Sequence, residues 1–440
     1  MIRVSTLIII AFLISSCERT AEQFELKSPD GTIAVQLEMK DNSPHYSIRI
    51  DGEEVIKSSA LGFDLISIPK LSAPLTILQQ STSENKSTWS QVLGEDKEIT
   101  DNHYFARFQV LSGSLEFYSL EFKVFDDGVG FRYVFPDWAG IDSLLIQDEL
   151  TEFNFAQDYL SWWIPNDWDS YERIYQTTPL SKSPGVNTPF TLRTESGIHI
   201  SIHEANLTEY SGMTLVPDTV GSTNWHAALV PWPDGLKVRS SLPHKSPWRT
   251  IQLGRTATVL GNSHLILNLN EPSQIADVSW IKPMKYMGIW WGMHIKTESW
   301  EQGPIHGATT QNAKRYIDYA SANGFQGLLI EGWNLGWENW GKQDAYSFTE
   351  TYDDFDIEQV TQYAASNGME IIGHHETGGD AESYDRRVEA AFQFYKKHGI
   401  NSIKTGYAGD IFPRGQYHHG QWMVRHYRRI VELAAEYEIT

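Results

Sequence analysis

The sequence predicts a multi-domain chain: an all-β part, most simply a large sandwich, followed by the first half of a (β/α)8 TIM barrel. The chain has 440 residues, 41% of them hydrophobic, which is enough for more than one core. Apolar and polar residues alternate up to about residue 275, and short apolar runs then alternate with segments of helical spacing. The predicted parts are a leader over 1–16, a sandwich over 17–276 and a partial barrel over 277–440.

The amino terminus has the pattern of an export signal. Arg3 precedes an apolar run over 7–14 that is too short to cross a bilayer as a helix. The following Ile14-Ser15-Ser16-Cys17 resembles the lipobox of bacterial lipoproteins, which implies cleavage before Cys17 and lipid on its sulfur. An ordinary secretory signal is the alternative, but Cys17 is the only cysteine. We therefore expect an exported, periplasmic or outer-membrane-anchored lipoprotein of a Gram-negative bacterium.

Strands are expected throughout the next part of the chain. Alternation begins at Ile33 and recurs on both sides of turn sequences such as Asp51-Gly52 and Asp127-Gly128. Gly and Pro separate the later runs, and no helical period is convincing. The clearest predicted strands cover 33–39, 46–50, 120–124, 131–135, 198–203, 249–253 and 265–269.

Beyond about residue 277 strands and helices are expected to alternate. The apolar runs cover 287–291, 325–330, 369–373 and 400–404, and the segments of helical spacing cover 309–323, 356–367, 381–398 and 421–437. Four such units predict a parallel sheet and about half of a barrel, which needs roughly 250 residues, so we expect a fragment of a longer protein. A doubly wound open sheet is the alternative, but no Gly-rich phosphate loop follows any run.

Composition narrows the class of partner. With 35 Lys and Arg against 56 Asp and Glu, the net charge is −21, so the chain lacks the bulk positive charge that nucleic-acid binding requires. Sixteen Trp and twenty Tyr provide flat apolar rings on which sugars stack, although core packing also uses such rings.

Chemically active residues follow the four apolar runs. In a barrel the active site lies at the carboxyl ends of the strands. These positions hold Trp291, Glu331, His374, Glu376 and Lys404. Carboxylates, imidazoles, a cation and indoles are what glycoside hydrolysis uses. In the alternative interpretation the tryptophans only pack at the barrel mouth, and Glu331 simply pairs with Lys404.

A transition-metal site is a rival interpretation of His374-His375-Glu376. Adjacent residues of a strand point to opposite faces, so at most one of the two imidazoles lines the site. The later pair His418-His419 is expected to be structural or exposed, and Asp353, Asp354 and Asp356 are expected to cap a helix. The sequence contains no Gly-x-Ser-x-Gly elbow.

Nine short segments, in one order, carry a family resemblance. They cover 161–165, 171–172, 203–206, 247–249, 288–291, 331–334, 374–379, 404–407 and 423–429. With them the sequence resembles glycoside hydrolase family 97, bacterial α-glucosidases and α-galactosidases, from about residue 25 to the end. The resemblance implies an amino-terminal β-super-sandwich, a central (β/α)8 barrel and a small carboxyl-terminal β-domain.

The resemblance also implies a mechanism and roles. Retaining members carry an Asp nucleophile after the fourth barrel strand, where this chain has Gly406, so an inverting α-glucosidase acting on starch-derived oligosaccharides is implied. Glu376 is then a base that helps to activate water, and Glu172 matches a ligand of the family's Ca²⁺ ion, its alternative being a surface acid. The substrate-binding residues implied or favoured are His374, Lys404, Trp291, Glu331 and Asn187.

Three expectations complete the prediction. The general acid, a second base and the other Ca²⁺ ligands of the family would lie beyond Thr440. The alternative functions are an α-galactosidase of the same family and a lipoprotein that binds glycans without hydrolysing them. The expected partners are an oligosaccharide substrate and a membrane, which the protein reaches through a lipid anchor; no nucleic-acid partner is expected. We expect the protein to be a monomer or a weak oligomer.

Overall fold

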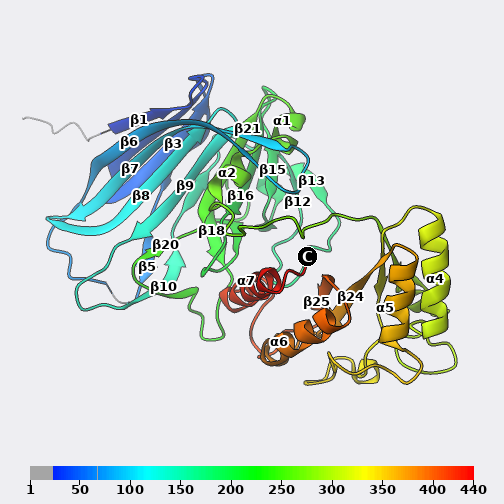
Figure 1. The fold of residues 1–440 in the computed structure, drawn as a ribbon. Coiled ribbons are helices and arrows are strands. Elements are labelled where there is room, and N and C mark those ends of the chain that lie inside the picture. Colours follow the sequence, from blue (N-terminus) through cyan, green and yellow to red (C-terminus); the bar gives the residue numbers. More distant parts are fainter. Residues whose placement is uncertain (1–22, 67) are drawn as a thin grey trace, which may run out of the picture.

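The computed structural model describes residues 23–66 and 68–440. An antiparallel β-rich part, blue to green in Figure 1, is followed by a parallel α/β part, yellow to red. The predicted leader over 1–16 and the lipid attachment at Cys17 lie outside the described residues and stay predictions. Among the described residues no helix is long and apolar enough to cross a membrane.

The largest sheet is antiparallel and lies in the amino-terminal part. Its strands are β6 (Leu75–Ser90), β7 (Glu98–Ser112), β8 (Leu115–Phe125), β9 (Gly128–Phe135), β12 (Leu160–Trp163), β13 (Gln176–Pro179), β15 (Phe190–Arg193), β16 (His199–Ala205), β20 (His244–Lys245) and β21 (Trp248–Gly254). They pair in the order β13-β12-β15-β16-β21-β9-β8-β7-β6, with β20 also on β9. Every residue of β9 is buried, because both faces of this central strand are covered.

Three smaller sheets complete the β-rich part. The first contains β1 (Gln23–Lys27), β2 (Ile33–Lys40), β3 (Ser43–Ile50) and β4 (Glu53–Ala60); the second contains β19 (Val238–Ser241), β10 (Ser143–Glu149) and β5 (Phe63–Leu65); the third contains β11 (Glu152–Asn154), β18 (Asn224–Leu229), β17 (Met213–Pro217) and β14 (Val186–Asn187). One hydrophobic core joins their inward faces to the large sheet: Val35 and Ile48 belong to the same cluster as Phe108 and Phe131. The predicted sandwich is therefore confirmed.

One predicted strand is wrong. The run Leu265–Leu269 forms the short helix α2, which follows another short helix, α1 (Ala257–Gly261). Leu265 and Leu269 lie one turn apart and pack where Gly128 and Gly130 of β9 have no side chain: a Cβ on those glycines would meet the leucine methyl groups at 2.8 and 2.5 Å. A five-residue apolar run has too few positions for its period to separate helix from strand.

The carboxyl-terminal part is a parallel sheet flanked by helices. Its strands, in spatial order, are β22 (Tyr286–Ile289), β23 (Gly327–Ile330), β24 (Glu370–Glu376) and β25 (Ser402–Gly406). Its helices are α3 (Trp291–His294), α4 (Thr310–Ala322), α5 (Ile357–Ser366), α6 (Ala381–Lys397) and α7 (Gln421–Glu436). Two short 3₁₀ segments lie in loops: η1 (Leu180–Lys182) in the β-rich part and η2 (Trp337–Asn339) in the parallel part. This order of elements agrees with a partial TIM barrel and confirms the predicted fold class.

Of the three acids expected to cap the second helix, only Asp356 does so, and Thr309 caps α4 although no cap was predicted there. The side chains of Thr309 and Asp356 accept the backbone N–H of Asn312 and Gln359 and so cap α4 and α5. Asp354 does not cap α5, because its carboxylate contacts His306 instead. Strands β24 and β25 extend further than predicted, to Glu376 and Gly406, since polar residues at a strand end are invisible to a search for apolar runs.

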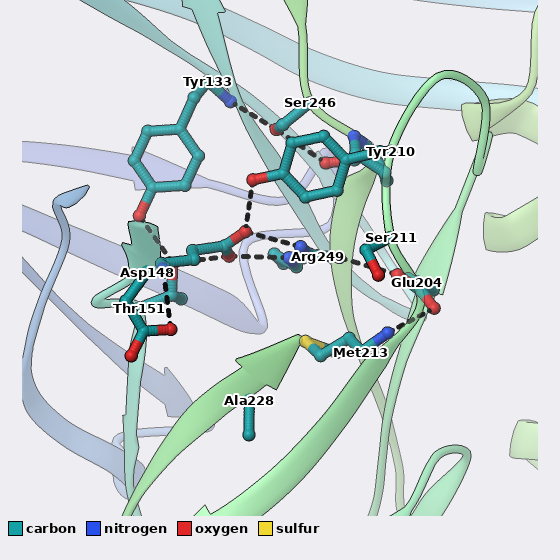
Figure 2. Close-up of polar contacts among 12 residues, drawn as sticks. Tyr133, Asp148, Thr151, Glu204, Tyr210, Ser211, Met213, Ala228, Ser246 and Arg249 are labelled. Atoms are coloured by element: carbon teal, nitrogen blue, oxygen red, sulfur yellow. Dashed lines mark hydrogen bonds and ion pairs between the residues drawn. The ribbon is translucent and has the colours of Figure 1, made fainter. Parts of the chain in front are cut away.

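A buried ionic network lies in the β-rich part (Figure 2). The guanidinium of Arg249 is completely shielded from solvent and forms two hydrogen bonds, of 2.8 and 2.6 Å, to the Glu149 carboxylate. Its third contact, of 2.7 Å, is to Glu204. The hydroxyl of Tyr210 also donates to Glu149, at 2.8 Å, so Arg249 and Tyr210 together compensate the charge of Glu149, which burial would otherwise disfavour.

Helix α7 is joined to the β-rich part by Gln421. Its amide oxygen accepts from Trp232 Nε1 at 3.0 Å and from the Arg239 backbone N–H at 2.9 Å. Its amide nitrogen donates to the carbonyl oxygens of Glu209 and Arg239 at 2.8 and 2.9 Å. All four hydrogen-bonding positions of this buried amide are therefore used across the contact between the two parts.

We predict that Gln421→Ala lowers the free energy of unfolding by about 2–3 kcal/mol, because several buried donors and acceptors lose their partner at once. Urea denaturation of the two proteins measures the difference. Gln393→Ala, on the exposed face of α6, is the matched control and is expected to change stability by less than about 0.5 kcal/mol. Equal effects of both substitutions would contradict a role of Gln421 at the joint.

Candidate active site

Four predicted residues meet at the carboxyl end of the parallel sheet. Glu331 directly follows β23, His374 and Glu376 lie on β24, and Lys404 lies on β25. The register places His374 opposite Lys404, and Glu376 opposite Gly406. Because side chains two residues apart on a strand share a face, His374 and Glu376 point to the same side of the sheet.

Glu331 is the centre of this group. Lys404 Nζ donates to its Oε1 at 2.8 Å, Trp300 Nε1 donates to its Oε2 at 3.1 Å, and His374 Nε2 lies 3.8 Å from Oε1. Burial alone would raise the pKa of Glu331, but His374, Lys404 and Trp300 together lower it. The expected pairing of Glu331 with Lys404 is thus present, and it orients both groups.

The two adjacent histidines have different environments. Burial lowers the pKa of His374 to about 4, so this imidazole is neutral near pH 7. His375 points to the opposite face, where its Nδ1 lies 2.9 Å from the Tyr384 hydroxyl and its ring stacks on Tyr395 at 4.5 Å. The described residues 23–66 and 68–440 contain no group of three acids, imidazoles or thiols that could hold a metal ion. The metal-site interpretation of the two histidines therefore has no support.

Glu376 presents one free oxygen. Its Oε1 accepts three backbone N–H groups, from Thr377 at 3.0 Å, Gly378 at 2.8 Å and Ala408 at 3.3 Å. Its Oε2 has no hydrogen-bond partner among the described residues. Burial raises the pKa of Glu376, and the three hydrogen bonds offset only part of that rise. The carboxylate is held rigidly while Oε2 remains able to accept a proton.

Gly406 leaves the space that Glu376 occupies. A Cβ at position 406 would lie 2.2 Å from Glu376 Oε2, which is far inside van der Waals contact. A side chain at position 406 would therefore require the Glu376 carboxylate to move from the position that it has here.

Aromatic side chains form a row along the same end of the sheet. Trp291 is 60% exposed and meets Trp290 edge to face at 5.5 Å, and Lys404 Nζ lies 6.0 Å from the centre of the Trp290 ring. Further along, Trp337 stacks on Trp300 at 5.8 Å and on His374 at 6.0 Å. Trp291 is thus free to stack on a ligand, whereas the half-buried Trp300 and the buried Trp337 support the polar group.

Sequence reasoning missed two of these contacts. Trp300 donates to Glu331, and Trp337 supports the His374 ring, yet neither lies next to an apolar run. The available signal was the density of tryptophan in the loops after β22 and β23, between residues 290 and 340. The residues that Trp300 and Trp337 contact are, however, determined by the tertiary structure, which the spacing of residues in the sequence does not reveal.

The two site residues predicted in the β-rich part are Asn187, at the end of β14, and Glu172, in the loop between β12 and β13. Asn187 is buried, and its amide accepts from the Asp167 backbone N–H at 2.9 Å and donates to the Ser170 carbonyl at 3.2 Å. It therefore holds the loop that carries Glu172. Glu172 is exposed, and the described residues bring no other acids to it that would complete a calcium cage. Both assigned roles, substrate contact for Asn187 and metal binding for Glu172, stay predictions.

The pair His418-His419 joins this loop to the parallel part. The His418 ring lies between Asp169 Oδ1, 2.8 Å from Nδ1, and the Tyr407 carbonyl, 2.8 Å from Nε2. The backbone N–H of His419 donates to the Trp168 carbonyl at 3.0 Å. The pair has the structural role that the sequence predicted, since it ties the loop of Glu172 to the loop that follows β25.

Two family models match the chain. The model described as Glycosyl-hydrolase 97 N-terminal matches residues 26–272, and the model described as Glycoside hydrolase 97 matches residues 290–440. Together they cover nearly all of the described chain, including the β-rich part and every residue of the group around Glu331.

Solved structures and curated proteins show the same relationship. Structures of a glycoside hydrolase family 97 enzyme from Pseudoalteromonas sp. strain K8, among them complexes with panose and with acarbose, are 42% identical with a TM-score of 0.90 and cover 95% of this chain. A retaining alpha-galactosidase of Bacteroides thetaiotaomicron is 22% identical over 99% of the chain, and a probable retaining alpha-galactosidase of Streptomyces bingchenggensis is 26% identical over 66%. The chain spans 65% of the Pseudoalteromonas enzyme, 66% of the Bacteroides protein and 42% of the Streptomyces protein.

Proposed function

Because the chain belongs to glycoside hydrolase family 97, we propose that the whole protein is a glycosidase that hydrolyses α-glucosidic bonds of starch-derived oligosaccharides with inversion of the anomeric centre. The observation that carries this proposal is the pairing of Gly406 with Glu376 across β24 and β25. Position 406 has no side chain that could act as a nucleophile on the fourth strand, while Glu376 holds a carboxylate beside it. The likeness to an enzyme crystallised with panose and acarbose supports the substrate class.

The proposed reaction begins with Glu376 as base. Its free Oε2 removes a proton from a water molecule, whose oxygen attacks the anomeric carbon while the glycosidic C–O bond breaks. The leaving oxygen takes its proton from a general acid, which the family resemblance assigns to a residue beyond Thr440. Neutral His374 and the Glu331–Lys404 pair supply donors and acceptors for hydroxyl groups of the sugar. Trp291 offers an exposed ring on which a sugar face stacks. The base stands on a rigid strand end, so little reorganisation is needed at the moment of reaction.

The anomer first released from an α-glucoside tests the proposal. Proton NMR of maltose hydrolysis in the first minutes is expected to show β-glucose before mutarotation. Initial release of α-glucose would overturn the inverting mechanism. Binding of the sugar without any product would instead favour a glycan-binding protein.

An α-galactosidase is the second candidate. It is favoured because two curated relatives, 22% and 26% identical to this chain, are named a retaining and a probable retaining alpha-galactosidase. The comparison of kcat/KM for the 4-nitrophenyl α-glucoside and α-galactoside separates the two candidates. We expect the glucoside to be preferred by at least about tenfold, and a preference for the galactoside would reverse the assignment.

We predict a raised acidic limb in the pH profile. Glu376 must be ionised to act as base, and burial raises its pKa above the ordinary value of 4.5. The kcat/KM should therefore rise with pH through a half-maximal point above 4.5, measured on an α-glucoside at constant ionic strength. A half-maximal point at or below 4.5 would contradict a buried carboxylate as the base.

Calcium binding by Glu172 is a further proposal, based on the family resemblance. The described residues do not by themselves form a calcium site, so no step of the reaction is assigned to the ion. We predict that Glu172→Gln weakens Ca²⁺ binding by at least about tenfold, because one charged oxygen ligand is lost. Isothermal titration with CaCl₂ measures this without any substrate. Equal affinity of the wild type and the variant would remove Glu172 from the ligands.

A further inference from the structure

His306 connects three segments of the parallel part. It lies in the loop between α3 and α4, and its side chain is completely shielded from solvent. Its Nδ1 lies 3.0 and 2.9 Å from the two carboxylate oxygens of Asp354, just before α5. Its Nε2 lies 3.0 Å from the carbonyl oxygen of Gly332, just after β23. The ring of Tyr352 stands edge-on at 5.3 Å.

Both polar partners of the His306 ring can only accept. A neutral imidazole has a single N–H, so it would turn a nitrogen lone pair toward either the carbonyl oxygen or the carboxylate. Facing lone pairs inside the protein are unfavourable, and at the buried Gly332 carbonyl solvent cannot separate them, whereas the side chain of Asp354 is 31% exposed. With both nitrogens protonated, the ring donates to both partners, and the carboxylate balances its charge.

The turn held by this ring sets the position of Glu331. Gly332 has φ +79°, and a Cβ there would lie 2.8 Å from the Trp300 carbonyl oxygen, so the chain reverses sharply directly after Glu331. The loop that carries Trp300 and His306 contacts this turn twice. Trp300 donates to the Glu331 carboxylate, and His306 donates to the next carbonyl along the chain.

We propose that His306 is held as an imidazolium and acts as a positioning residue, fixing the turn after β23 so that Glu331 meets Lys404 and the sugar. The effect on the sugar rests on the proposed function, since it requires that the Glu331–Lys404 pair binds hydroxyl groups of the substrate. The protonation state does not rest on it.

Steady-state kinetics test the positioning role. With an α-glucoside, His306→Gln is expected to raise KM about tenfold and to change kcat by less than about threefold, because a binding group is displaced while the base stays in place. The same substitution in a Glu331→Gln background should have almost no further effect on KM, since it acts through Glu331. Independent effects that add in the double variant would overturn the role. His103→Gln removes a buried His–Asp contact of the β-rich part and should leave KM unchanged.

Nitrogen NMR of the His306 ring tests its charge without any activity. We expect both ring nitrogens of the wild-type protein to carry a proton at pH 7, and a single protonated nitrogen would overturn the imidazolium. In the Asp354→Asn variant the side-chain amide of residue 354 can donate a hydrogen bond to Nδ1 of His306. We therefore expect a neutral His306 ring that keeps its contact to Gly332, and an almost unchanged KM. A strongly raised KM in that variant, with the contact to Gly332 intact, would contradict positioning through this contact. If the protein hydrolyses no glycoside while the imidazolium is seen, only the proposed function fails.

Discussion

Replacement of Glu376 by Gln is expected to lower kcat on an α-glucoside by about 10²- to 10⁴-fold, while the sugar still binds. The amide has almost the same size as the carboxylate, and its oxygen can still accept the N–H groups of Gly378 and Ala408. What is lost is a group able to take a proton from water. Steady-state kinetics and titration with a non-hydrolysed oligosaccharide measure both quantities.

A matched substitution separates this effect from a loss of negative charge. Glu382 is exposed in the first turn of α6, and Glu382→Gln is expected to retain nearly the wild-type rate. Turnover of Glu376→Gln within about threefold of the wild type would remove Glu376 from the catalytic residues. A large loss in affinity with unchanged kcat would instead make it a binding residue.

From the sequence we predicted the β-sandwich and the α/β part that follows it, and the end of the parallel sheet at which the candidate site lies. Caps such as Thr309 and Asp356, and alternation such as that of Ile33 to Met39, act over a few neighbouring residues, so their signals are local and readable. The short run of α2 failed because its geometry depends on Gly128 and Gly130, which lie more than a hundred residues away. A local sequence pattern therefore does not predict a helix whose packing space is created by glycines far away in the chain.

In the candidate site, too, some features could be predicted from the sequence and others could not. The strand-end rule brought Glu331, Glu376 and Lys404 to one end of the sheet, because it depends only on parallel topology. The supporting contacts of Trp300 and His306 come from a loop whose path is fixed only in three dimensions. Residue type and order therefore predicted which polar side chains meet at this end of the sheet, but not the residues that hold them in place.

We expect Arg249→Met to lower the free energy of unfolding by about 3–5 kcal/mol. The substitution leaves Glu149 and Glu204 buried without their cation. Burial would raise the pKa of Glu149, but Arg249, Tyr210 and Thr151 together lower it, whereas burial keeps the pKa of Glu204 raised despite its contact with Arg249. Urea denaturation at pH 7 measures the loss. Arg428→Met, which removes an exposed pair with Glu432 on α7, should change stability by less than about 0.5 kcal/mol.

The pH dependence of the loss identifies its cause. In the wild type, the lowered pKa of Glu149 gives stability that is present above the unfolded value of about 4.3 and is lost as the pH falls through the lower, folded pKa. In Arg249→Met the carboxyls bind protons on folding, so stability rises as the pH falls toward 4. The deficit should therefore shrink steadily from pH 7 to pH 4. A deficit independent of pH would mean that lost packing, and not the unpaired carboxylates, causes the destabilisation.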